Sequence, residues 1–263
     1  MSAVQPGLSA ESRTLPRFGG INPTLFGIEL RRMLRNRRLV IFALLFPLLM
    51  YFVFSNQKYG DNRIGSGNVA AFILVNMALY GAALTSASIG SMVAMERAQG
   101  WSRQLRLTPL NPASYIVLKA LVALVMGAVV IVVVNVVSAT HGNAQMPTDV
   151  WVYCAVLTMF CTLTFAALGV FIGYIVPGEN AMQILGPGLA ALSFLGGVFI
   201  PLSQYSSTML HIAYWTPMYG VSEIARAPLT HELPWYSVVN AVGWLVVFVA
   251  GAAWRMSKDT ARV

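Results

Sequence analysis

The sequence predicts an all-α polytopic membrane protein with six transmembrane helices. Of its 263 residues, 57% are hydrophobic and 10% are charged, whereas a soluble domain carries about 25% charged residues. Several apolar runs are long enough to cross the hydrocarbon core of a bilayer. With a cytosolic N-terminus, 14 of the 17 basic residues fall in cytosolic segments. This asymmetry predicts that both termini lie in the cytosol and that the net charge of +8 reflects orientation in the cytoplasmic membrane, not nucleic-acid binding.

The N-terminal residues precede the first span and are polar. Residues 1–21 are rich in Pro, Gly and Ser and contain no signal-peptide-like apolar run, so we predict a flexible cytosolic tail. Residues 22–38 predict an amphipathic helix on the membrane surface, begun by Asn22 or Thr24. Its apolar and basic residues occupy different faces: Phe26, Leu30, Met33 and Leu34 against Arg31, Arg32, Arg35 and Arg38. The alternative is a plain basic flank of the first span.

Six spans follow in order, with boundaries set by the apolar runs. They are predicted at residues 39–54, 69–94, 113–138, 151–176, 181–202 and 235–254. The first is short and contains Pro47. Lys119, near the inner end of the third, is expected to extend its ammonium group to the membrane surface. The outer loops keep Lys58, Arg63 and Arg226.

Small residues and helix breakers distinguish two of the spans. The second span carries two ladders of small residues, which favour close packing either within the chain or across a dimer. They are Ala82, Ser86 and Gly90, and Ala83, Ala87 and Ser91. The fifth span is rich in Gly and Pro, which predicts a broken helix beside a cavity. Residues 203–234 predict short helices that dip into the outer leaflet.

The sequence offers no visible active site or metal site. The spans lack a mid-membrane carboxylate, and the chain has no phosphate-binding Gly-rich loop followed by Lys. Cys154 and Cys161 lie in one apolar run, which predicts buried thiols, and the three histidines lack metal-ligand spacing. We therefore expect a non-enzyme with no metal and no cofactor of its own. A membrane enzyme that acts on lipids is the alternative.

The stretch Met95–Pro112 separates the second and third spans and is both basic and amphipathic. It is too polar to cross a bilayer, and its leucines give it one apolar side. Such a segment lies against lipid or a partner protein, and we predict that it binds a partner.

Three motifs resemble those of one family. Met95-Glu96-Arg97 through Gly100, with Gln104-Leu105-Arg106-Leu107-Thr108-Pro109-Leu110, resembles a Glu-Arg-Glu-x-Gly-Thr-x-Glu-x-Leu-x-x-Thr-Pro pattern. Gly196–Pro201 followed by Trp215–Tyr219 looks like a second signature, and the basic helix at 22–38 looks like an elbow helix. Together they resemble the permease subunits of type-2 ABC transporters, including daunorubicin-exporter-like drug efflux permeases. Ala98 and Trp101-Ser102-Arg103 depart from the pattern and make the stretch more basic and bulkier.

The resemblance implies one transmembrane domain over residues 22–263 that works as a homodimer or heterodimer with two cytosolic ATPase subunits. ATP and Mg²⁺ would be bound by the ATPases. A coupling helix between spans 2 and 3 would contact them through Glu96, Arg97, Gly100, Trp101, Arg103, Gln104 and Arg106. Candidate pathway residues are Asn76, Met77, Tyr80, Phe194 and Phe199. Ordinary helix packing is the alternative for each of them.

The resemblance further implies export of a hydrophobic or amphipathic compound such as a drug, an antibiotic or a lipid. A lipid-linked glycan is the rival substrate. A scaffold or self-immunity protein that binds an ATPase without transport is the remaining alternative.

Overall fold

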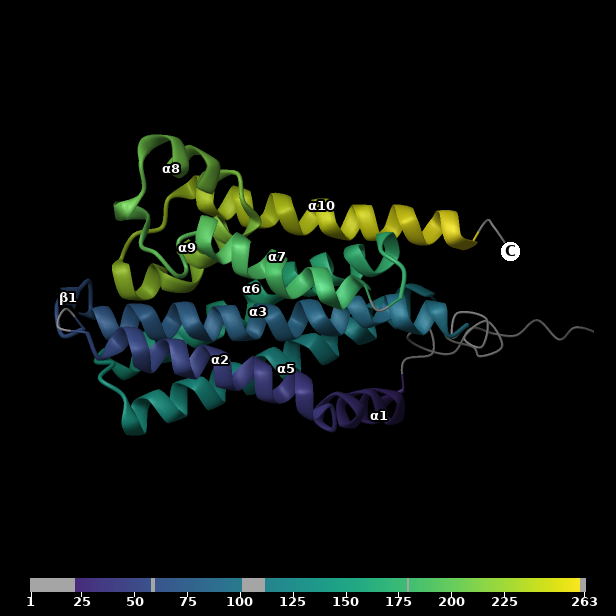
Figure 1. Cartoon of the computed structure of the whole chain (residues 1–263), viewed down its shortest axis with the longest axis horizontal. Coiled ribbons are helices and arrows are strands. Elements are labelled where there is room, and N and C mark those ends of the chain that lie inside the picture. The colour runs from purple at the N-terminus through teal and green to yellow at the C-terminus, as the bar shows by residue number, and fades with distance from the viewer. Residues whose placement is uncertain (1–21, 58–59, 101–111, 179, 261–263) are drawn as a thin grey trace, which may run out of the picture.

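The computed structural model describes residues 22–57, 60–100, 112–178 and 180–260, and these residues are almost entirely helical (Figure 1). The helices are α1 (Pro23–Leu34), α2 (Arg37–Ser55), α3 (Val69–Ala98), α5 (Pro112–His141), α6 (Thr148–Ile175), α7 (Asn180–Leu195), the 3-10 turn η2 (Leu202–Gln204), α8 (Ser207–Tyr214), α9 (Pro217–Thr230) and α10 (Trp235–Thr260). A minimal antiparallel hairpin of β1 (Arg63–Ile64) and β2 (Gly67–Asn68) joins α2 to α3.

Helix α3 is the centre of the bundle and packs against α2, α5, α6, α7 and α9. Nearly all of its residues are buried, because small and apolar side chains occur on every face of the helix. A Cβ added at Gly90 would collide with the carbonyl oxygen of Ala166, and one at Gly169 would collide with that of Ala87. Both small-residue ladders of α3 are buried in this way. The choice between the two kinds of packing is thus settled: the ladders pack within the chain.

Four described helices are long and apolar enough to cross a membrane. They are α3, residues Ala113–His141 of α5, α6, and residues Trp235–Lys258 of α10. On α10 the exposed face is itself apolar and includes Val238, Val242 and Val249, an arrangement suited to lipid contact. These helices confirm a multi-pass membrane protein, whereas the count of six spans stays a prediction. The pair formed by α1 and Leu39–Ser55 is bent by 58°, and α7 has only 16 residues.

The predicted surface helix is shorter than expected and lies at an angle to α2. It begins as predicted at Asn22, whose side chain accepts a hydrogen bond of 2.9 Å from the backbone N–H of Thr24. It ends at Leu34, because Asn36 caps the next helix through the N–H of Leu39 at 3.3 Å. Arg37 and Arg38 therefore belong to α2. Whether α1 lies in the membrane surface stays a prediction.

Helix α7 differs from the predicted fifth span in two ways. Pro187 lies inside α7 without breaking it, and the helix stops at Leu195 instead of residue 202. The stop lies at Gly196-Gly197, where Gly197 has a φ of +77° that an L side chain rarely adopts. The chain then forms η2, α8 and α9, which confirms short helices in the region 203–234.

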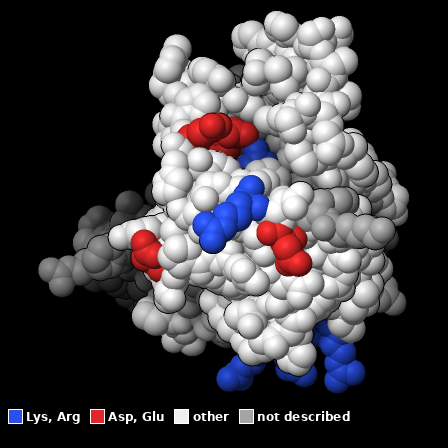
Figure 2. Space-filling view, turned by 90° about the vertical axis from the view of Figure 1, so that its left-hand side faces the viewer, with Lys and Arg blue, Asp and Glu red and all other residues white. Residues whose placement is uncertain are grey.

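The two ends of the bundle carry different charges. The hairpin, α8 and α9 form one end, and α1, the last turns of α3 and the end of α10 form the other (Figure 1). Figure 2 shows the hairpin end, where acidic groups lie beside a basic group near the centre of the view and further basic groups project at its lower edge. The charged residues in this part of the sequence are Asp61, Arg63, Asp149, Glu223, Arg226 and Glu232. The α1 end is the basic one, as its residues Arg31, Arg32, Arg35, Arg37, Arg97, Arg255 and Lys258 indicate.

Candidate functional site: a buried charge cluster and an aromatic group

A cluster of four charged side chains joins α1, α3 and α5 at the basic end. Lys119 on α5 is completely buried, and its Nζ donates to Glu29 Oε2 at 2.8 Å and to Glu96 Oε1 at 2.6 Å. Arg32 Nη1 also donates to Glu96 Oε1, at 2.8 Å, and lies 3.6 Å from Glu29 Oε1. Two positive and two negative charges give the cluster a net charge of zero. A buried charge is tolerated when it is paired in this way.

The position of Lys119 corrects the expectation that its side chain reaches the membrane surface. Its ammonium group points between α1 and α3 because two carboxylates meet it there, and it lies 5.3 Å from the ring centre of Tyr115. Glu96 is likewise only 3% exposed, and its Oε2 atom has no hydrogen-bond partner among the described residues. The Glu96 side chain is therefore buried inside the chain, where it joins α1, α3 and α5.

Arg97, the second charged residue of the stretch 95–112, also points inward. Arg97 Nη1 donates to the carbonyl oxygens of Gly173 and Tyr174, both at 3.2 Å, and its guanidinium lies 4.9 Å from the Tyr174 ring centre. These carbonyls belong to the last turns of α6, where a cation is favoured by the helix dipole. Met95, Glu96 and Arg97 continue α3 instead of starting a separate segment. Gly100 follows with a φ of +74°.

Trp101, Arg103, Gln104 and Arg106 lie outside the described residues. Their two neighbouring helices are nevertheless held together, because the Glu96–Lys119 pair joins α3 to α5.

Three of the five candidate pathway residues form one aromatic group. Phe199 lies between Tyr80 and Phe194, with ring centres 5.0 Å and 4.8 Å away. Phe46 on α2 joins them at 5.5 Å from Tyr80. Phe194 is 48% exposed and Phe46 is 37% exposed, so the group reaches the surface of the chain. Aromatic rings at such spacing give a broad apolar surface with specific geometry.

Asn76 and Met77 have different surroundings. Asn76 is buried one turn from Tyr80, and its Oδ1 accepts a hydrogen bond of 3.2 Å from Arg226 Nη1. Met77 is part of the apolar core. The structure therefore brings Tyr80, Phe194 and Phe199 together, and places Asn76 beside a buried arginine.

Arg226 itself was expected in an outer loop, but it is buried in α9. It donates to the carbonyl of Gly197 at 2.8 Å, forms an ion pair with Glu223, and lies 4.8 Å from the ring centre of Phe72. It thus fastens α9 to α3 and to the turn after α7. Because Arg226 donates to the Gly197 carbonyl, the irregular backbone at this turn keeps a hydrogen-bond partner inside the protein.

Sequence reasoning missed Glu29 and Phe46, and it placed Arg32 on the basic face of the surface helix without predicting its ion pair with Glu96. Glu29 is the only acidic residue in the basic stretch 22–38, and this isolation was a usable signal of a specific partner. Nothing in the sequence signals Phe46. Among the described residues, no group of three or more His, Cys, Asp or Glu side chains is placed to hold a metal ion.

Comparisons with known proteins agree with this architecture. A family model described as "ABC-2 type transporter" matches residues 23–230. A Bacillus subtilis (strain 168) protein named "Putative transport permease YvfS" is 26% identical over 241 residues, which cover 89% of this chain and 96% of that protein.

Proposed function

Because the chain belongs to the ABC-2 type transporter family, we propose that it is the membrane-spanning permease subunit of an ATP-driven exporter. It moves a hydrophobic or amphipathic compound out across the cytoplasmic membrane. Two cytosolic ABC ATPases supply the energy, and a second permease copy, identical or related, completes the pathway. The permease itself binds neither ATP nor Mg²⁺ and catalyses no reaction.

The observation that carries this proposal is the buried charge cluster beside the partner-binding stretch. The stretch 95–112 begins in the last turn of α3, which carries Glu96, and ends at Pro112, the first residue of α5, which carries Lys119. Glu96 and Lys119 are joined to each other and to Glu29 of α1. A displacement imposed on the stretch by an ATPase therefore moves α1, α3 and α5 together. Arg97 extends the same connection to α6.

The aromatic group supports the proposal that the transported compound is hydrophobic or amphipathic. The buried Tyr80 and the partly buried Phe199 contact the exposed Phe46 and Phe194, whose rings reach the surface of the chain. A surface of this kind suits amphipathic or apolar molecules better than ions. In the proposed dimer, the two copies face each other with α3 and α7 along the pathway. The orientation follows from charge, since the basic end holding α1 faces the cytosol.

Reconstitution with an ABC ATPase encoded beside this chain tests the proposal. The permease in lipid nanodiscs is expected to have no ATPase activity alone and to raise the activity of the ATPase when paired. In proteoliposomes, Tyr80→Ala and Phe199→Ala should reduce transport of an amphipathic dye without preventing assembly. Phe160→Ala is the matched control, because this exposed ring lies on α6 outside the aromatic group.

Two outcomes would contradict the proposal. Failure to associate with any ABC ATPase would remove the coupling mechanism. Turnover of a lipid by the purified chain alone would instead support the membrane enzyme. Charge reversal at Arg103 and Arg106 should abolish stimulation of the ATPase while leaving membrane insertion intact, and unchanged stimulation would remove the partner-binding role of residues 95–112.

A further inference from the structure

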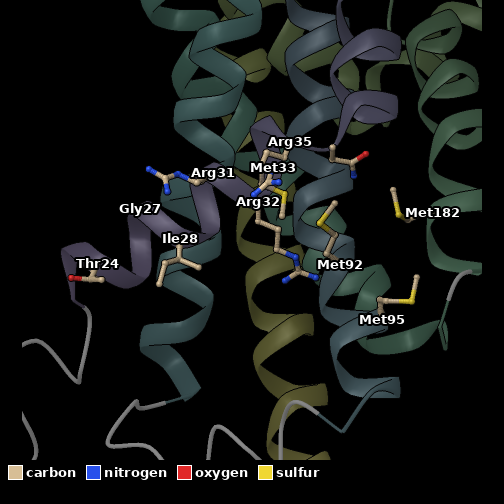
Figure 3. Close-up of a pocket in the computed structure, with 11 residues that line it drawn as sticks. Thr24, Gly27, Ile28, Arg31, Arg32, Met33, Arg35, Met92, Met95 and Met182 are labelled. Atoms are coloured by element: carbon tan, nitrogen blue, oxygen red, sulfur yellow. The ribbon is translucent and has the colours of Figure 1, made fainter.

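We infer that a pocket at the basic end of the bundle binds one phosphate-bearing anionic amphiphile. The pocket has a volume of about 900 Å³ and lies between α1, the last turns of α3 and the start of α7. Figure 3 shows Met92 and Met95 on α3 with Met182 on α7, and Ile28 with the arginines on α1. This volume is in the range of small-molecule sites.

The charges of the pocket are not balanced by the protein. Arg32, one of three arginines in its lining, is already paired with Glu96 in the neutral charge cluster. Arg31 and Arg35 line the pocket as well, and in the described part of the chain no ion pair joins either of them to a carboxylate. Within the described residues, these two positive charges therefore have no carboxylate partner.

The spacing of these two arginines suits a phosphate group. Arg31 lies in the last turn of α1 and Arg35, four residues on, is its C-cap residue with helical backbone angles, so the two side chains emerge about one turn apart on the same side. Guanidinium groups bind phosphate oxygens through paired, charge-assisted hydrogen bonds. Both side chains are exposed, so an incoming anion reaches them without displacing a protein partner.

The remaining wall of the pocket is apolar. Met92, Met95 and Met182 supply flexible thioether side chains, and Ile28 is 60% exposed on α1. Methionine adapts its shape to irregular apolar ligands. An apolar wall beside two unpaired guanidinium groups matches a molecule with an anionic head and an acyl tail. A free phosphate ion would use only the arginines.

This inference does not depend on the proposed transport function, because it concerns binding to the chain alone. Its test is native mass spectrometry of the purified full-length chain in dodecyl maltoside. The probes are dioctanoyl phosphatidylglycerol, dioctanoylglycerol, which has the same tails and no phosphate, and inorganic phosphate as competitor. We expect one phosphatidylglycerol per chain, at least tenfold weaker binding of dioctanoylglycerol, and little competition by phosphate.

Three variants locate the site. Arg31→Gln with Arg35→Gln should weaken binding of phosphatidylglycerol at least tenfold, and Met182→Trp should weaken it by filling the apolar side while both arginines remain. The matched control removes two charges from the same end of the bundle through Arg255→Gln with Lys258→Gln, and should bind normally. A monodisperse elution profile shows that each variant is folded.

The inference is overturned by any of three results. Equal loss in the control pair means that binding follows overall charge and not this pocket. Full competition by inorganic phosphate at the lipid's own concentration means that the site takes a soluble anion. Unchanged binding by Met182→Trp means that the apolar wall does not contact the ligand.

Discussion

Removing Lys119 tests whether the charge cluster stabilises the bundle. In Lys119→Met, Glu29 and Glu96 stay buried with Arg32 as the only cation that the described residues still pair with them, and the net charge of these three side chains becomes −1. Breaking a buried ion pair by removing one partner costs about 3–5 kcal/mol. The Arg32 side chain is 48% exposed and still bridges both carboxylates, so we expect the lower limit, a loss of about 3 kcal/mol in the free energy of unfolding.

A second substitution shows whether this loss comes from charge. Adding Glu29→Gln to Lys119→Met restores a net charge of zero, because Arg32 then faces Glu96 alone. We expect this double variant to recover about 2 kcal/mol of the loss, since the cost arises from the unpaired buried carboxylate. The matched control Lys258→Met removes an exposed lysine that lies 3.8 Å from the Trp254 ring centre. It should change stability by less than about 1 kcal/mol.

The measurement is reversible unfolding in mixed micelles, in which the mole fraction of sodium dodecyl sulfate is raised and helix content is followed by circular dichroism. The reasoning is refuted if Lys119→Met loses less than about 1 kcal/mol. It is also refuted if adding Glu29→Gln destabilises the chain further, because the lysine would then contribute through packing and not through charge.

The same unfolding assay checks two further substitutions. Gly169→Ala places a methyl group against the backbone of α3 and should lower the free energy of unfolding by about 1–3 kcal/mol. Its control, Gly188→Ala, has open space around it and should be neutral or slightly stabilising. Equal effects of the two substitutions would contradict close packing of α3 on α6. Arg226→Met should lower the free energy of unfolding by about 3 kcal/mol, because it leaves Glu223 and several acceptor oxygens without their donor. An equally stable variant would show that apolar contacts hold α9 in place. Cys154 and Cys161 are both buried, so a maleimide should label them on the order of 100-fold more slowly in the folded chain than after unfolding, and rapid labelling of either thiol would place it in an open cavity.

The sequence by itself determined the features that depend on local composition and period. Apolar runs without charge predicted membrane helices, and Asn22-Pro23 predicted the start of α1, because a cap depends only on neighbouring residues. The concentration of basic residues in the segments on one side of the predicted spans indicated that one end of the helix bundle is more basic than the other. The burial of Cys154 and Cys161 followed from their place in an apolar run.

The tertiary structure alone decided which helix faces meet. Small residues spaced four apart in the sequence predicted that one face of α3 packs closely against another helix. They did not predict that this helix is α6, because a face of small residues can pack against many apolar helices. Lys119 was predicted to reach the membrane surface because it lies near the inner end of its span. Glu29, the partner that helps to keep it buried, lies 90 residues away.

The candidate sites show the same division. Tyr80 and Phe199 could be chosen from the sequence as residues of the second and fifth spans, but their contact depends on where α7 ends and the chain turns at Gly197. The pocket at the basic end depends on the 58° bend between α1 and α2 and on the packing of α7 near α3. Such sites are set by long-range packing, which local patterns do not encode, because the partner of each face is chosen by the fold of the whole chain.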